Sequence, residues 1–166
     1  TLQSDMAEVR EWLSRYHLAI ETKPRYGMKL FGSEVSIRCC LTDLLYQISQ
    51  EANESPLLTL EALNSGMLET LQPLLHQCFS RFHVRLTDDS EHYLRLYCAV
   101  AVRRISEGYP LTDFDAEDVD GDVRDAARHI INLMRPITGK AISPAEEAYL
   151  RVNIAARRVQ EMAPSA

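Results

Sequence analysis

The sequence predicts a mainly α-helical protein, an antiparallel helical bundle preceded by a helix and a small β-hairpin. Apolar residues recur at helical spacing along most of the chain, and helix start and stop signals bracket these stretches. Only one pair of short β-prone runs interrupts the pattern. Because the later helices are joined by short connections, we expect antiparallel neighbours. The chain of 166 residues is long enough for one well-buried domain plus a fragment of another.

The first 32 residues predict a helix followed by a hairpin. Apolar side chains at helical spacing indicate a helix from Thr1 to Tyr16. Two β-prone runs, at residues 18–22 and 28–31, flank a turn signal from Pro24 to Gly27. So short a segment cannot bury a core alone. We expect it to pack against a further segment, either upstream in the chain or elsewhere in the protein.

A connecting helix is predicted next, from Ser33 to about Gln50. The stretch EANESP at residues 51–56 is the most polar and turn-rich in the chain, and we place a domain boundary there. The predicted domains are residues 1–32 as the helix and hairpin, residues 33–55 as the connecting helix and linker, and residues 56–166 as the helical bundle.

The bundle is predicted to consist of an apolar segment at residues 57–63 and four longer helices. The approximate bounds of these helices are 65–82, 88–107, 122–137 and 144–162. From Leu96 to Val102 the second of them is apolar on almost every side, so we expect it to be buried on more than one face. The last helix has a strong start signal, with Ser143 at the N-cap and Pro144 at the first position.

The charge of the chain argues against nucleic-acid binding by all of it. The net charge is −6, while residues 1–50 are neutral with six Lys/Arg against six Asp/Glu, so only the first part is compatible with DNA. No apolar run approaches the ~20 residues that span a bilayer, and we expect no membrane association. The chain begins at Thr1 without a secretory leader, which indicates an excised fragment.

Neither a metal site nor an enzyme site is predicted. The acidic loop at residues 113–122 does not supply acids at the first and twelfth positions of a calcium loop. No nucleophile, base and anion site assemble, so we expect no catalysis and no cofactor. The cysteine spacing matches neither zinc nor a disulfide framework. We interpret these residues as free thiols in a reducing cytoplasm: Cys39, Cys40, Cys78 and Cys98.

Two runs near the start resemble the recognition helix and wing of a winged helix, and the resemblance implies that residues 1–32 are a partial winged-helix segment ahead of the bundle. They are TLQSDM at residues 1–6 and KPRYGMKLFGSE at residues 23–34, and they match the larger activators that have tandem helix-turn-helix segments. Because that pattern has a further helix before Thr1, we expect weak or no DNA binding by this chain alone. Basic wing residues usually contact phosphates, with a solvated face as the alternative. The DNA-contact candidates are Arg10, Arg15, Lys23, Arg25 and Lys29.

The run YLRLYCAVAVRRISEGYP at residues 93–110 resembles the signature helix of the phosphotransferase-system (PTS) regulation domain. In that pattern, Leu-x-x-His-x-x-x-Ala-x-x-Arg followed by a glycine, the phosphorylatable histidine falls on Tyr97. The run that starts at Pro144 resembles the second pattern, Pro-x-x-Glu-x-x-Tyr-Leu-x-x-His, with Asn153 at the histidine position. The resemblance implies a regulation domain that has lost both phosphorylation sites. We interpret Tyr97 as a core aromatic residue with its hydroxyl at the rim.

The resemblance implies a fragment of a DNA-binding regulator of a carbohydrate (PTS) operon, of the multi-domain mannitol-type activator class. A homodimer is expected, with DNA bound through the intact N-terminal region of the full-length protein. The PTS phosphocarrier or sugar-permease components are further expected partners of that longer protein. The regulation domain would act in dimerisation and signal relay. The alternatives are a fragment of an RNA-binding antiterminator and a purely structural helical dimerisation module.

Overall fold

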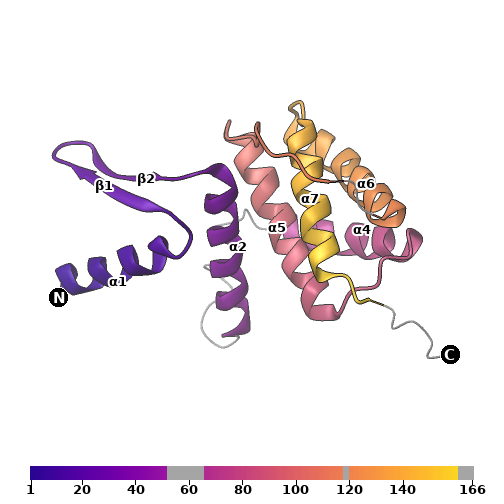
Figure 1. Ribbon diagram of the computed structural model, residues 1–166, viewed down its shortest axis with the longest axis horizontal. Helices are drawn as coiled ribbons and strands as arrows, with labels where there is room; N and C mark the ends of the chain where they lie inside the picture. Colours follow the sequence, from indigo (N-terminus) through magenta and orange to yellow (C-terminus); the bar gives the residue numbers. More distant parts are fainter. Residues whose placement is uncertain (52–65, 118–119, 161–166) are drawn as a thin grey trace.

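The computed structural model describes residues 1–51, 66–117 and 120–160, and it confirms the mainly α-helical fold. A short helix and a hairpin project from one helix of a bundle (Figure 1). The predicted segment at 57–63 and the boundary region at 52–56 lie outside the described residues, whereas the last helix ends at Arg157, earlier than the predicted end near residue 162. The elements are α1 (Leu2–Ser14), β1 (Ala19–Lys23), β2 (Gly27–Phe31), α2 (Glu34–Gln50), α4 (Met67–Arg81), α5 (Asp88–Ser106), α6 (Gly121–Thr138) and α7 (Pro144–Arg157).

The hairpin and α1 form a small unit with little core of its own. The strands β1 and β2 pair antiparallel, from Ala19 opposite Phe31 to Lys23 opposite Gly27. Buried side chains gather only near α2, in a cluster of Leu13, Leu18 and Cys40. This agrees with the expectation that so short a segment cannot bury a core alone.

Gly32 makes the passage from the hairpin to α2 possible. Its backbone has a φ of +156°, and a Cβ atom added there would lie 2.2 Å from Cδ2 of Leu18. Only glycine avoids both the backbone strain and this overlap. Ser33 then caps α2, because its side chain accepts a hydrogen bond from the backbone N–H of Ser36 at 3.1 Å.

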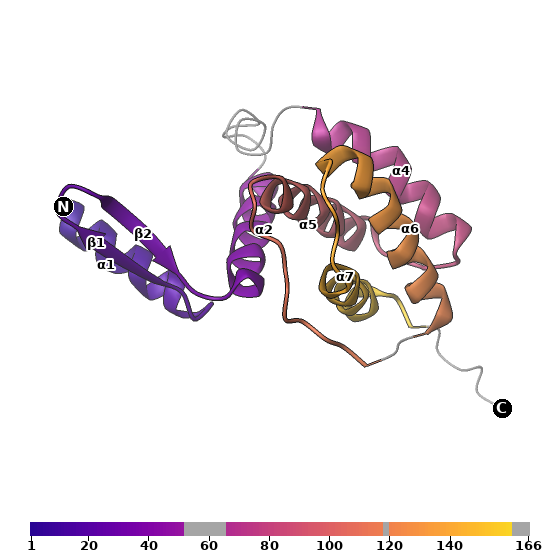
Figure 2. The ribbon, with the colours of Figure 1, turned by 90° about the horizontal axis from the view of Figure 1, so that it is seen from above.

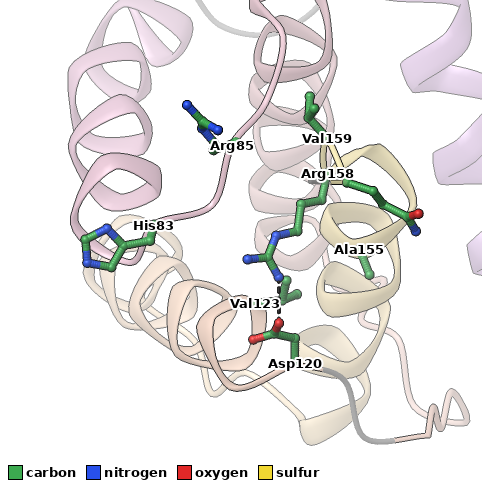
Figure 3. A pocket seen from close by; sticks show the side chains of 8 residues that line it. His83, Arg85, Asp120, Val123, Ala155, Arg158 and Val159 are labelled. Atoms are coloured by element: carbon green, nitrogen blue, oxygen red, sulfur yellow. Dashed lines mark hydrogen bonds and ion pairs between the residues drawn. The ribbon is translucent and has the colours of Figure 1, made fainter. Parts of the chain in front are cut away.

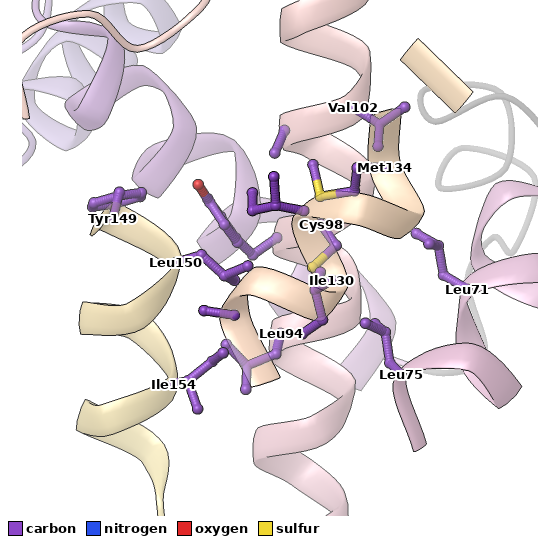
Figure 4. Close-up of a cluster of buried hydrophobic side chains, with 14 of the residues drawn as sticks. Leu71, Leu75, Leu94, Cys98, Val102, Ile130, Met134, Tyr149, Leu150 and Ile154 are labelled. Atoms are coloured by element: carbon purple, nitrogen blue, oxygen red, sulfur yellow. The ribbon is translucent and has the colours of Figure 1, made fainter. Parts of the chain in front are cut away.

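Helix α5 lies at the centre of the bundle and contacts α2, α4, α6 and α7 (Figure 2). Between Tyr93 and Val102 its side chains are buried except for Arg95, so the prediction of burial on more than one face is confirmed. Figure 4 shows the core that α5 forms with its neighbours. The labelled core residues are Leu71 and Leu75 of α4, Leu94, Cys98 and Val102 of α5, Ile130 and Met134 of α6, and Tyr149, Leu150 and Ile154 of α7.

Helix α2 packs against α5 and shares the core of the bundle. Leu45 is 6% exposed and belongs to the same buried cluster as the α5 residues, with Val35 and Leu41 packed against it. The division of the chain at residues 51–56 stays a prediction. Among the described residues, no helix combines the length and the apolar character that crossing a membrane requires.

Candidate functional site

The two positions where the regulation-domain pattern expects histidine lie on facing helices, with Tyr149 between them. The ring centroids of Tyr97 on α5 and Tyr149 on α7 are 5.4 Å apart in an edge-to-face contact. Asn153 is half-buried, and its Nδ2 donates a hydrogen bond to the Tyr149 carbonyl at 3.0 Å. Phe114 also packs against Tyr149 in an edge-to-face contact, with 5.1 Å between ring centroids.

Tyr97 is a core aromatic residue, as interpreted from the sequence. The residue is 3% exposed, and its phenol lies near the charges of Arg38 and Glu146. Burial raises the pKa of Tyr97 well above its ordinary value, and the nearby Arg38 offsets only part of that rise.

Arg38 and Glu146, the two charges near Tyr97, form a buried ion pair that joins α2 to the start of α7. The side chains of Arg38 and Glu146 are 0% and 2% exposed. Nη1 of Arg38 donates a hydrogen bond to Oε1 of Glu146, and Nη2 donates one to Oε2. Nη2 of Arg38 donates to Oε2 of Glu146 at 2.9 Å and to the Tyr109 carbonyl at 3.0 Å. Because a two-pronged arginine–carboxylate pair is geometrically specific, it fixes α2 against α7.

Glu34 extends this pair to the end of α5. Its Oε1 accepts from Nε of Arg38 at 3.0 Å and from Nε of Arg104 at 2.8 Å. Its Oε2 accepts from Nη2 of Arg104, also at 2.8 Å. We call Glu34, Arg38, Arg104 and Glu146 the Arg38 network. Its two carboxylates are both engaged by arginine, so the network holds helices together and offers no free base.

Electrostatics in the network favour its charged state. Burial by itself lowers the pKa of Arg38, but the hydrogen bonds to Glu146 and Glu34 and the nearby charges outweigh burial and raise it. The hydrogen bond to Glu34 likewise raises the pKa of Arg104. Both arginines therefore stay protonated, as the ion pairs require.

The start of the loop at residues 109–117 is hydrogen-bonded to the start of α7, next to the Arg38 network. Ser143 stands at the N-cap of α7, but its side chain makes no capping bond there. Its hydroxyl donates instead to the Leu111 carbonyl at 2.5 Å, and the Leu111 N–H donates to Oε2 of Glu146 at 3.4 Å. The start of the loop is thereby attached to α7.

A second polar contact, centred on Asp43 of α2, lies between α1 and the bundle. Oδ2 of Asp43 accepts from the Tyr16 hydroxyl at 2.8 Å, and Oδ1 accepts from the Tyr93 hydroxyl at 2.6 Å. Burial and the hydrogen bond to Asp43 raise the pKa of both phenols. We call Tyr16, Asp43 and Tyr93 the Asp43 bridge.

The five DNA-contact candidates are all exposed and lie apart from Tyr97 and Asn153, on α1 and the hairpin and just after α1 (Figure 1). Lys29 lies over the ring of Phe31, with Nζ 5.2 Å from the ring centroid. Arg25 occupies the turn with a positive φ of 78°. The structure thus leaves the basic side chains accessible from solvent, and their contact with DNA stays a prediction.

A surface cavity of about 460 Å³ lies between the segment that follows α4, the start of α6 and the end of α7 (Figure 3). Its polar lining includes His83, Arg85 and Arg158, together with Asp120, which pairs with Arg158 at 2.9 Å. The hydrogen bond from the Asp122 backbone, followed by that from Arg158, lowers the pKa of Asp120. The arginine next to Asp120 therefore already has a carboxylate partner.

Sequence reasoning missed the Arg38 network and the Asp43 bridge. Glu34 and Arg38 stand four residues apart on one helix, a spacing typical of a solvated ion pair and the only local signal. The partner Glu146 lies 108 residues further along the chain. No local pattern reveals a contact of that separation.

The cysteines differ in how accessible their thiolates are, and this predicts an order of alkylation. Burial raises the pKa of Cys78 and Cys98 to about 12 and that of Cys40 to about 11. Cys39 is half-buried, so we expect iodoacetamide near pH 8 to modify it first and Cys98 last. Peptide mass spectrometry over time would measure the order. Equal rates at Cys39 and Cys98 in protein with native circular dichroism would contradict it.

Comparison with known proteins gives one curated relative and no family model that matches the chain. Over 112 residues, 66% of this chain, the sequence is 30% identical to the probable licABCH operon regulator of Bacillus subtilis (strain 168). The match covers 17% of that protein, so the chain spans a small part of the curated relative's length. The matched stretch relates this chain to one portion of an operon regulator.

Proposed function

We propose that this chain is a regulatory fragment of a DNA-binding transcriptional regulator of a carbohydrate (PTS) operon. In this proposal the helical bundle is a regulation domain that acts in dimerisation and signal relay and is not itself phosphorylated at the usual positions. The observation that carries the proposal is the state of those positions. Tyr97 is 3% exposed and Asn153 is bonded to the Tyr149 backbone, in a chain similar to an operon regulator.

Chemistry at these two positions supports the absence of phosphotransfer. A histidine accepts a phosphoryl group because its neutral imidazole has a free ring nitrogen near pH 7. The pKa of the Tyr97 phenol is raised well above its ordinary value by burial, so its nucleophilic anion is scarce. The amide nitrogen of Asn153 is a donor without a nucleophilic lone pair.

The contacts of α2 support a relay role. This helix follows the hairpin directly and is bonded at its start to α5 and α7 through the Arg38 network. A change in the packing of α5 or α7 would therefore move the segment that bears the basic candidates. Phosphate contacts by those residues, a homodimer and exchange with PTS proteins belong to the longer protein in this proposal.

A phosphotransfer experiment tests the proposal. The unmodified chain, incubated with phosphoenolpyruvate and the purified PTS phosphotransfer proteins, is expected to gain no acid-labile phosphate. Asn153→His restores a histidine at a half-buried position, and we expect label there if the transfer proteins recognise this bundle. Tyr97→His places the ring in the interior, and we expect no label.

The phosphocarrier protein, labelled in the same reaction, is the positive control. Acid-labile label on the unmodified chain would overturn the proposal that the bundle is a relay without phosphorylation. Peptide mapping would assign any label to one of the other histidines, His17, His76, His83, His92 or His129.

A further inference from the structure

The unit of α1 and the hairpin is joined to the rest of the described chain by a narrow contact with α2 (Figures 1 and 2). The buried apolar part of the contact consists of Leu13 and Leu18 against Cys40, with four partly buried apolar or aromatic side chains around them. Both faces of the hairpin are largely exposed, and Ile20 is its only partly buried strand residue. So little apolar area leaves the orientation of the unit dependent on the polar contact beside it.

That polar contact is the Asp43 bridge. One carboxylate oxygen of Asp43 binds the unit of α1 and the hairpin, and the other binds the bundle. Tyr16, just beyond the end of α1, donates to Oδ2, and Tyr93 of α5 donates to Oδ1. Hydrogen bonds from hydroxyl groups to a charged carboxylate are short and among the stronger ones in proteins. A single side chain of α2 thus holds a residue of each unit.

Both phenols are themselves held in place. The Tyr16 ring packs edge-on against Trp12, with centroids 5.4 Å apart. On the bundle side, the Tyr93 ring packs edge-on against Tyr46 at 5.6 Å. The guanidinium carbon of Arg157, at the end of α7, lies 3.4 Å from the Tyr93 ring centroid. These contacts restrict the rotation of both tyrosine side chains. The bridge therefore constrains the orientation of α1 relative to the bundle.

We propose that the Asp43 bridge is a coupling point that fixes the orientation of α1 and the hairpin relative to the helical bundle. When the Tyr16 hydroxyl is removed, the unit remains folded but moves about the start of α2. The biological meaning of this coupling rests on the proposed function. Its existence is a property of the chain alone.

Amide residual dipolar couplings measure the coupling, because they report the orientation of each N–H bond in a common frame. In the unmodified protein, α1 and α5 are expected to share one alignment tensor of equal magnitude. In Tyr16→Phe the magnitude for α1 and the hairpin is expected to fall below that for α5. Tyr26→Phe is the matched control, because Tyr26 is 87% exposed on the hairpin turn and its loss leaves one tensor.

Tyr93→Phe and the double variant provide the decisive comparison. Tyr93→Phe leaves the Tyr16 bond to Asp43 in place, so the double variant is expected to show no more loss of alignment than Tyr16→Phe alone. Trp12, the sole tryptophan, provides a second readout through its fluorescence anisotropy decay, which is expected to gain a larger mobile component.

A common tensor retained in Tyr16→Phe would overturn the inference, as would losses that add in the double variant. Unchanged couplings within α5 and α7 establish that the bundle remains folded in each variant. The measurement uses neither DNA nor PTS proteins. Its failure is therefore distinct from a failure of the proposed function, which the phosphotransfer experiment decides.

Discussion

Replacing Arg38 by alanine is expected to lower the free energy of unfolding by about 3–5 kcal/mol, because the charge of Glu146 stays buried without its partner. Glu146 is 2% exposed and cannot regain water without opening the contact between α2 and α7. The loss would also leave Glu34 with Arg104 alone, and the Tyr109 carbonyl without its donor. Urea unfolding followed by circular dichroism measures the change.

The exposed pair of Arg103 and Glu107 provides the matched control. Both side chains are 45% exposed and their N–O distance is 2.9 Å, so Arg103→Ala should cost no more than about 1 kcal/mol. Replacing Arg38 by Met and Glu146 by Leu together should recover most of the stability, because neither charge is then left alone. A cost for Arg38→Ala as small as that for Arg103→Ala would contradict the prediction.

Leu94→Ala is the second large effect that we expect, a loss of about 2–5 kcal/mol in unfolding free energy. Leu94 is 0% exposed in the centre of the bundle, within the same buried cluster as Ile130 and Ile154 (Figure 4). Truncation removes the transfer free energy of the side chain and leaves a cavity that the surrounding helices fill only in part. The same urea titration measures the loss.

Leu2→Ala is the matched control, because Leu2 is 78% exposed on α1. A change within about 0.5 kcal/mol is expected there, as for other surface substitutions. An unchanged slope of free energy against urea would show that Leu94→Ala alters stability rather than compactness. Equal costs at the two leucines would show that α5 is not at the centre of the core.

The helices were predictable from sequence because their signals are local. The helix expected at residues 88–107 is α5, Asp88–Ser106, and that expected from Ser33 to Gln50 is α2, Glu34–Gln50. Apolar spacing and capping residues act within one or two turns, so a single sequence contains them. The positions of Tyr97 and Asn153 on facing helices follow from those predicted helices together with antiparallel packing.

The polar contacts of α2 were not predictable, because each joins residues far apart in the chain. Arg38 meets Glu146 across 108 positions, and Asp43 meets Tyr93 across 50. Arginine in a helix is usually exposed, and nothing near Arg38 in sequence signals complete burial. The charged surroundings of Tyr97 have the same origin, since they are contributed by α2 and α7.

The pairing of Arg38 with Glu146 also has a consequence for how the two positions can change during evolution. A lineage that loses one of the two charges passes through a protein several kcal/mol less stable, whereas replacing both by apolar side chains of similar volume restores much of the stability. Most domains have only about 5–15 kcal/mol of stability in total, so the intermediate step is close to unfolding. The two residues, 108 positions apart, are therefore constrained to persist or to be replaced together.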